Sequence, residues 1–307
     1  MKFLNVLMYL AKNIFINLVI TCVTIFLLHF ALSQTFQIDS NLLDSIKYVL
    51  NLFIFEYGSI NLSNTALPTQ HIFNSYFAFT FSLSLVSFVF AILFGFVIAY
   101  YLAIKPKSIF AKLSNTTFFV LSSIPIFLLG ALAIILNKNV SLPITYIDSY
   151  YGSFWLSFVS LITPVLLLII LVLPLCVALF YPTLRSIVQS EYYLWAKANG
   201  FSKQKIFWTV LIRNFIGEFA TKIVFIYLFL MSYTMILERF FYIPGQSFVF
   251  QYLTNKSYFS LLMYAILLNM VTIFTIKSAG ELLNYLLDAK LEKQSHFILR
   301  RRINVKA

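Results

Sequence analysis

The sequence predicts an all-α integral membrane protein with about six transmembrane helices. Hydrophobic residues make up 61% of the 307-residue chain and charged residues only 10%, whereas about a quarter of the residues in a soluble domain are charged. Long segments also contain no Asp, Glu, Lys or Arg, and the basic residues gather in alternate connections between those segments.

Six segments are apolar enough to span a bilayer, which takes about 20 residues of helix. The predicted spans are residues 13–38, 72–104, 113–137, 149–184, 223–237 and 257–276. The fifth segment is short, but Lys222 beside it can extend its ammonium group toward the headgroups. The fourth is long enough for one span and an interfacial piece near Tyr150, and two tightly joined spans are the alternative.

The distribution of charge predicts the orientation. With the N-terminus in the cytoplasm, 18 of the 22 basic residues lie inside and four lie outside, namely Lys47, Lys138, Arg239 and Lys256. This positive-inside bias places both termini, including a basic tail over 292–307, in the cytoplasm. Anionic inner-leaflet lipid accounts for the net charge of +12, so no nucleic-acid partner is expected.

The first span could be read as a signal peptide, because Ala31-Leu32-Ser33 resembles a cleavage site. Its full span length favours an uncleaved anchor instead. We expect a single domain over residues 1–307.

Prolines occur inside two of the predicted spans. Pro125 follows Ser122 and Ser123 in the third span, where the hydroxyls could compensate for a backbone hydrogen bond lost at the proline. A kink lined by hydroxyls is a candidate lining of a pore, and a kink that serves packing alone is an equal alternative. The fourth span contains three prolines, at 164, 174 and 182, so we do not expect a straight, uninterrupted helix there.

The longest basic connection, residues 182–222, predicts a rigid pair of helices. Gly200 can adopt the left-handed conformation that ends a helix, and Ser202 can cap the helix that follows. Small residues at 196, 198 and 200 would let another protein approach the backbone closely. Exposed aromatic residues are typical anchors of such a contact, although packing at the membrane interface is an alternative role for them.

This connection resembles the "EAA" loop of binding-protein-dependent ABC importer permeases, in particular the oligopeptide, dipeptide and nickel branch. The resemblance rests on Glu191-Tyr192, Ala196, Ala198, Gly200 and Arg213-Asn214. An ordinary cytoplasmic helical hairpin is the alternative. The residues expected at the ATPase contact are Glu191, Tyr192, Tyr193, Trp195, Ala196, Ala198, Gly200, Arg213 and Asn214.

Two further stretches fall in the order that the family shows. Glu238, Phe241, Pro244 and Gly245 match its Glu-x-x-Phe-x-x-Pro-Gly turn, expected at the outer mouth, although Gln246-Ser247 replaces Leu-Gly. Leu286-Leu287-Asp288-Ala289-Lys290-Leu291 resembles its Leu-Leu-Asp-Pro-Arg-Leu ending. The first half departs most, because Ser33-Gln34-Thr35-Phe36 stands where relatives carry Gly-Asp-Pro.

The resemblance implies a type I importer permease with a permease core over 72–291. It implies a second homologous permease, two cytoplasmic ATPase subunits and an extracytoplasmic binding protein as partners, in a bacterial cytoplasmic (inner) membrane. The chain has no Walker A sequence, so the resemblance makes it a non-enzymatic subunit that needs no cofactor. A peptide is the first cargo expected and nickel or a metal–chelator complex the second, with haem and glutathione left open.

Other classes of membrane protein fit less well. An ABC exporter permease would lack the loop described above. An intramembrane enzyme or an ion-coupled transporter usually needs ionisable residues within its spans, and the predicted spans hold almost none. Cys22 and Cys176 lie inside spans, and the three histidines lack ligand spacing, so no metal site is expected.

Overall fold

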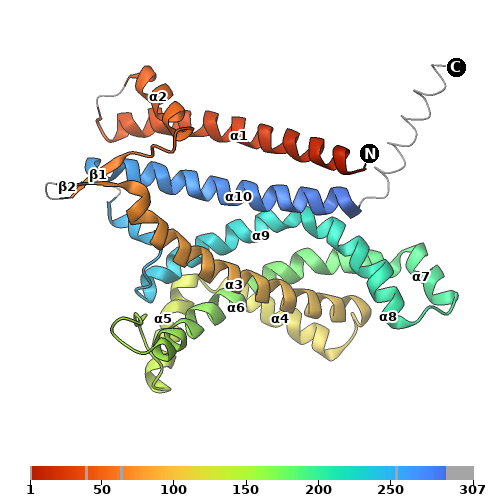
Figure 1. Ribbon diagram of the computed structural model, residues 1–307. Helices are drawn as coiled ribbons and strands as arrows, with labels where there is room; N and C mark the ends of the chain where they lie inside the picture. Colours follow the sequence, from red (N-terminus) through yellow and green to blue (C-terminus); the bar gives the residue numbers. More distant parts are fainter. Residues whose placement is uncertain (1, 39–40, 63–64, 253–254, 288–307) are drawn as a thin grey trace, which may run out of the picture.

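The computed structural model describes residues 2–38, 41–62, 65–252 and 255–287, and most of them are helical (Figure 1). Within this part of the chain, five helices are long and apolar enough to cross a membrane, and a bent pair of helices can form a sixth crossing. The predicted all-α membrane fold is therefore confirmed.

The elements are α1 Lys2–Thr35, α2 Leu42–Leu52, β1 Ser59–Leu62, β2 Thr65–Pro68, α3 Thr69–Ile104, α4 Ile109–Ser123, α5 Ile126–Asn139, α6 Phe154–Gln189, α7 Glu191–Ala198, α8 Lys203–Ile206, the π-helix η1 Phe207–Ile212, α9 Arg213–Phe240, the 3-10 helices η2 Gln246–Tyr252 and η3 Lys256–Tyr258, and α10 Phe259–Leu287.

The third predicted span is broken rather than kinked. Helix α4 ends at Ser123, α5 begins at Ile126, and the two axes differ by 100°. Ile124 is extended, with φ −87° and ψ 122°, because a following proline disfavours the helical conformation of the residue before it. The pair still crosses the bundle. It starts just after α3 ends, and Asn137 near its far end accepts a hydrogen bond from Thr163 in the first half of α6 at 3.0 Å.

The fourth predicted span is one continuous helix, α6, that contains all three prolines. The expectation of an interruption was wrong, because tertiary contacts hold the helix together: Pro164 and Pro174 are buried among neighbouring helices. Ser153 caps its first turn by accepting from the N–H of Leu156 at 3.3 Å. Tyr150 therefore lies in an exposed turn before the helix, and the alternative of two joined spans is excluded.

Helices α3, α6 and α9 pack together in the bundle, α10 covers α9, and α1 lies at the edge against α10 (Figure 1). Small residues permit the closest approaches, as is common between membrane helices. A Cβ on Gly95 of α3 would lie 2.5 Å from Cys176 Cβ of α6. A Cβ on Gly280 of α10 would lie 2.7 Å from the carbonyl oxygen of Ala220 on α9.

The connection between α1 and α3 contains helix α2 and a hairpin in which β1 pairs antiparallel with β2. Ile60 of β1 is fully buried against the starts of α3 and α10. Thr69, the first residue of α3, donates to the carbonyl of Gly58 from both its backbone N–H and its hydroxyl. The connection is thus packed onto the end of the bundle opposite α7 and α8, as Figure 1 shows.

Candidate functional site

The candidate site is the segment of residues 190–212 between α6 and α9, which we call the α7–α8 segment. Helix α7 ends in a complete Schellman motif at Gly200. The Gly200 N–H donates to the Lys197 carbonyl at 3.1 Å and the Phe201 N–H donates to the Ala196 carbonyl at 3.2 Å. Gly200 has φ +74°, so the predicted left-handed helix end is confirmed.

The turn between α7 and α8 is short and is stabilised by several side-chain contacts. The Ser202 hydroxyl accepts from the Lys205 N–H at 3.3 Å, which confirms the predicted cap of α8. The rings of Trp195 and Phe201 meet edge to face at 6.2 Å, and the Lys205 ammonium lies 4.0 Å from the centre of the Phe201 ring. The two helices are therefore held at a fixed angle by contacts on both sides of the turn.

The inner face of the α7–α8 segment packs on the bundle. Ala196 is only 2% exposed, and Tyr193 is half-buried against the central core. Leu211 is fully buried, and the Phe207 ring lies 5.5 Å from that of Tyr100 on α3. The expectation that Ala196 leaves room for another protein is therefore wrong, because its methyl group faces this chain's own interior.

The outer face carries most of the other expected contact residues. Glu191, Tyr192, Trp195, Ala198 and Gly200 are exposed. A Cβ on Gly200 would have no atom of this chain within 4 Å, so its conformation, rather than crowding, requires glycine. Trp208, which was not predicted as a contact residue, is also exposed. A tryptophan in a basic connection was the signal that could have identified it.

A π-helix, η1, leads from α8 into α9. Asn214 closes this wide turn, because its side-chain amide donates to the Val210 carbonyl at 2.6 Å. Arg213 beside it is exposed. Of the two expected contact residues here, Arg213 is therefore available to a partner, while the Asn214 amide bonds to the preceding η1 helix. Single π-turns are rare and often occur at functional sites.

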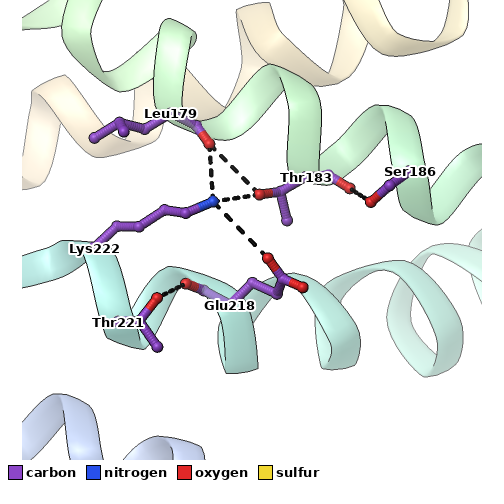
Figure 2. A network of polar contacts seen from close by, with 6 residues as sticks. All are labelled: Leu179, Thr183, Ser186, Glu218, Thr221 and Lys222. Atoms are coloured by element: carbon purple, nitrogen blue, oxygen red, sulfur yellow. Dashed lines mark hydrogen bonds and ion pairs between the residues drawn. The ribbon is translucent and has the colours of Figure 1, made fainter.

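Lys222 on α9 joins the spans on either side of the α7–α8 segment, as Figure 2 shows. Its ammonium group donates to Thr183 Oγ1 at 2.5 Å and to the Leu179 carbonyl at 3.2 Å, both on α6. Glu218, one turn earlier on α9, lies 3.9 Å away. Lys222 was expected to extend toward the headgroups, but it reaches across to α6 instead.

A second cation fastens the end of α6 to α3. The guanidinium group of Arg185 donates to the Ala103 carbonyl at 2.8 Å, close to the C-terminus of α3. Lys222 and Arg185 thus tie α6 to two different neighbours just before the α7–α8 segment begins. These two contacts join α3, α6 and α9 near that segment.

Comparison with known protein families gives one match, over residues 91–293, to the binding-protein-dependent transport system inner membrane component. The chain belongs to this family. No curated protein matches the chain. The permease is accordingly a multi-pass membrane protein of a binding-protein-dependent ABC importer, a class that works with ATPase subunits and a binding protein. The matched residues include the α7–α8 segment and leave out α1, α2 and the hairpin.

At the opposite end of the permease, the Pro244-Gly245 turn folds back onto α9. The fully buried carboxylate of Glu238 accepts from Thr80 Oγ1 at 2.5 Å and from the Ser247 N–H at 3.0 Å. A Cβ on Gly245 would lie 2.1 Å from Glu238 Cδ, so only glycine fits against the carboxylate. Thr80 was missed in the sequence, because it lies on the distant helix α3.

The replacement of the family's Leu-Gly by Gln246-Ser247 has a structural counterpart. The Gln246 side chain is buried and accepts from the Asn269 amide of α10 at 2.8 Å. The turn is therefore linked to α3, α9 and α10 at once. Farther along the chain, residues Asp288 to Leu291 and the basic tail 292–307 lie outside the described residues.

The candidate pore residues Ser122 and Ser123 are exposed at the end of α4. Both hydroxyls donate to the Phe119 carbonyl, at 2.9 and 2.8 Å. They do not compensate for Pro125, as was expected, because the Leu121 carbonyl one turn before that proline accepts from the Ile124 N–H instead. In the described part of the chain, no group of three His, Cys, Asp or Glu side chains could hold a metal ion.

Proposed function

We propose that this permease forms half of a translocation path for a peptide, paired with a second homologous permease, and that the α7–α8 segment is its contact with an ATPase subunit. The observation that carries the proposal is the rigid pair of short helices with aromatic side chains, Tyr192 and Trp195, on its outer face. Such residues are typical anchors of protein–protein contacts.

The attachment of the segment supports a mechanical role. Closure of two ATPase subunits on ATP would move the two contact segments of the paired permeases together. The Schellman motif keeps α7 and α8 at a fixed angle, and Tyr193, Phe207 and Leu211 pack the segment onto the bundle. Lys222 and Arg185 would then pass the displacement into α9, α6 and α3.

The same proposal includes the orientation. The α7–α8 segment, the turn around Lys105 and the basic tail would lie in the cytoplasm, as would both termini. The Pro244-Gly245 turn would then face the binding protein at the outer mouth. The positive-inside distribution of basic residues supports this arrangement.

A peptide is the proposed cargo because the α7–α8 sequence resembles the branch that carries peptides and nickel. Nickel or a metal–chelator complex is the alternative within the same branch. Uptake measurements distinguish these two cargoes in proteoliposomes that contain the complete transporter and its binding protein. Uptake of a labelled peptide mixture without uptake of radioactive nickel supports the proposal. Uptake of nickel without uptake of peptide would contradict it and favour the nickel alternative.

Trp195→Ala tests the contact, with Trp155→Ala as a matched control. Trp195 is 63% exposed on α7 and Trp155 is 67% exposed at the start of α6, at the other end of the bundle. We expect Trp195→Ala to reduce copurification of the ATPase subunits and Trp155→Ala to leave it unchanged. Equal copurification in both variants, at equal thermal stability, would remove Trp195 from the contact.

A further inference from the structure

Helix α2 has three different sides. One side packs against α1: Ser45 is fully buried and its hydroxyl lies 3.0 Å from His29 Nδ1, while the Tyr48 ring stacks on the His29 ring at 4.5 Å. A second side exposes apolar residues to the surroundings, each 45–68% exposed: Leu42, Leu43, Ile46 and Leu50. At 3.6 residues per turn these four lie within about 100° of one another around the helix.

The third side of α2 is polar. Lys47 is exposed beside the apolar arc, followed around the helix by Asn51 and Asp44, which are half-buried. Around its axis the helix therefore presents a packed side, an apolar side and a polar side. This is the pattern of a helix that lies in the plane of a membrane surface, where acyl chains, headgroups and protein meet.

The depth of α2 is fixed by its contact with α1. His29 lies six residues before the end of α1 at Thr35, so at 1.5 Å per residue α2 crosses α1 about 9 Å inside that end. The His29 ring also lies 5.2 Å from the ring of Phe259, the first residue of α10. Helix α2 thus runs beside the last turns of one span and the first turn of another, rather than beyond them.

Helix α1 also exposes apolar side chains at this depth. Leu27 and Val23 on the same half of α1 are both exposed, as expected for a span at the edge of the bundle. The residues that follow α2 continue its apolar side, since Phe53, Ile54 and Phe55 are exposed as well. An exposed apolar arc at this depth, beside the last turns of one span and the first turn of another, has acyl chains as its natural neighbour.

We propose that α2 is an interfacial helix, seated in the membrane leaflet at the end of the bundle opposite the α7–α8 segment. Its apolar arc contacts acyl chains, and Lys47 at the border of that arc reaches the lipid phosphates. The helix anchors the connection between α1 and α3 to the bilayer surface. This inference does not depend on the cargo or on which side of the membrane is cytoplasmic.

Spin labels on single cysteines test the proposal. The background carries Cys22→Ala and Cys176→Ala, the second of which keeps the Cβ that packs against Gly95. Labels are placed on the arc by Ile46→Cys or Leu50→Cys and at the polar border by Lys47→Cys or Asn51→Cys. The permease is measured in bilayer discs of phosphatidylcholine and phosphatidylglycerol, alone and with the subunits that copurify with it.

We expect labels at 46 and 50 to collide mainly with oxygen, which dissolves in the acyl region, and labels at 47 and 51 mainly with a water-soluble nickel chelate. The ratio of the two accessibilities should be severalfold higher on the arc, in the permease alone and in the complex. Nickel-chelate collisions as frequent at 46 as at 47 would show that the arc faces water and overturn the proposal. Immobilised arc labels, shielded from both reagents in the complex, would show that a protein partner covers α2 and would overturn it equally.

Discussion

Lys222 on α9 donates a hydrogen bond to Thr183 on α6 at 2.5 Å, directly beside Pro182. Proline has no N–H to donate to the carbonyl one turn earlier, which weakens the helix around it. In the same place the Lys222 ammonium group also binds the Leu179 carbonyl. The interaction thus supports a proline-weakened turn of α6 and joins it to α9, about two turns of α6 before the α7–α8 segment begins.

Lys222→Met should weaken this junction. Hydrogen bonds that involve a charged group contribute about 1.5–3 kcal/mol, so we expect a loss of that order in thermal-unfolding measurements. Thr183→Val should have a similar effect, and the double variant should lose much less than the sum. Glu218→Gln is the control, because Glu218 is 62% exposed and 3.9 Å away, and such a pair contributes at most about 1 kcal/mol. Full additivity of Lys222→Met and Thr183→Val would contradict a direct interaction.

Gly200→Val should abolish transport and ATPase stimulation while the protein still inserts in the membrane. A left-handed conformation costs an ordinary residue about 1–2 kcal/mol, and a β-branched residue adopts it least readily. Gly200→Asn is the control, since asparagine tolerates this conformation and no atom lies within 4 Å of the added Cβ. Normal uptake by Gly200→Val at normal expression would contradict the proposed role of the α7–α8 segment.

Gly245→Ala should destabilise the opposite end of the bundle. The added Cβ would lie 2.1 Å from the buried carboxylate carbon of Glu238, and relief of such overpacking typically costs about 1–3 kcal/mol. Gly217→Ala is the matched control on α9, because its Cβ would meet nothing closer than 3.7 Å. Thermal unfolding in detergent measures both variants, and equal midpoints would show that the turn can move aside.

Labelling of introduced cysteines checks the orientation. Cysteines at Asp148 and Asn255, both exposed at the end opposite α7 and α8, should react with an impermeant thiol reagent added to whole cells. A cysteine at Lys203 on α8 should react only after the membrane is permeabilised. Labelling of position 203 in intact cells would reverse the proposed topology.

Ser123→Trp distinguishes a pore from simple packing. Ser123 is exposed at the break between α4 and α5, so a large ring would project away from this chain. If the break lines the path, uptake should fall while the ATPase subunits still copurify. Loss of both uptake and copurification would indicate a packing role, and retention of both would remove the segment from the mechanism.

Local chemistry made parts of this structure predictable. Gly200 and Ser202 specify their turn through conformations and hydrogen bonds that involve only nearby residues, and both appear as expected. The inward orientation of Ala196 could not be predicted, because it depends on how Phe207 and Leu211 dock onto the bundle. Pro125 signalled an irregularity in the third span. The 100° bend there depends on tertiary packing, as does the unbroken course of α6 through its three prolines.

Other features leave a signal in the sequence that was not used to predict them. The apolar spacing of Leu42, Ile46 and Leu50, with Lys47 between them, is an amphipathic pattern that predicts a helix. The hydrogen bond between Lys222 and Thr183 leaves a weaker signal in the sequence. It consists of a basic residue at the end of one span and a hydroxyl residue near the end of the preceding span. The partnership of Glu238 with Thr80 leaves none, because residues so far apart in the chain meet only once the helices have packed.

Helix α6 has 36 residues, which at 1.5 Å per residue makes it about 54 Å long. The hydrocarbon core of a bilayer is about 30 Å thick, so the helix exceeds it even when tilted. Its excess length extends beyond the hydrocarbon core, and α7 follows directly after Ser190. A displacement of α7 would therefore act on α6 through a long lever, whose proline-weakened turn at Pro182 is held by Lys222.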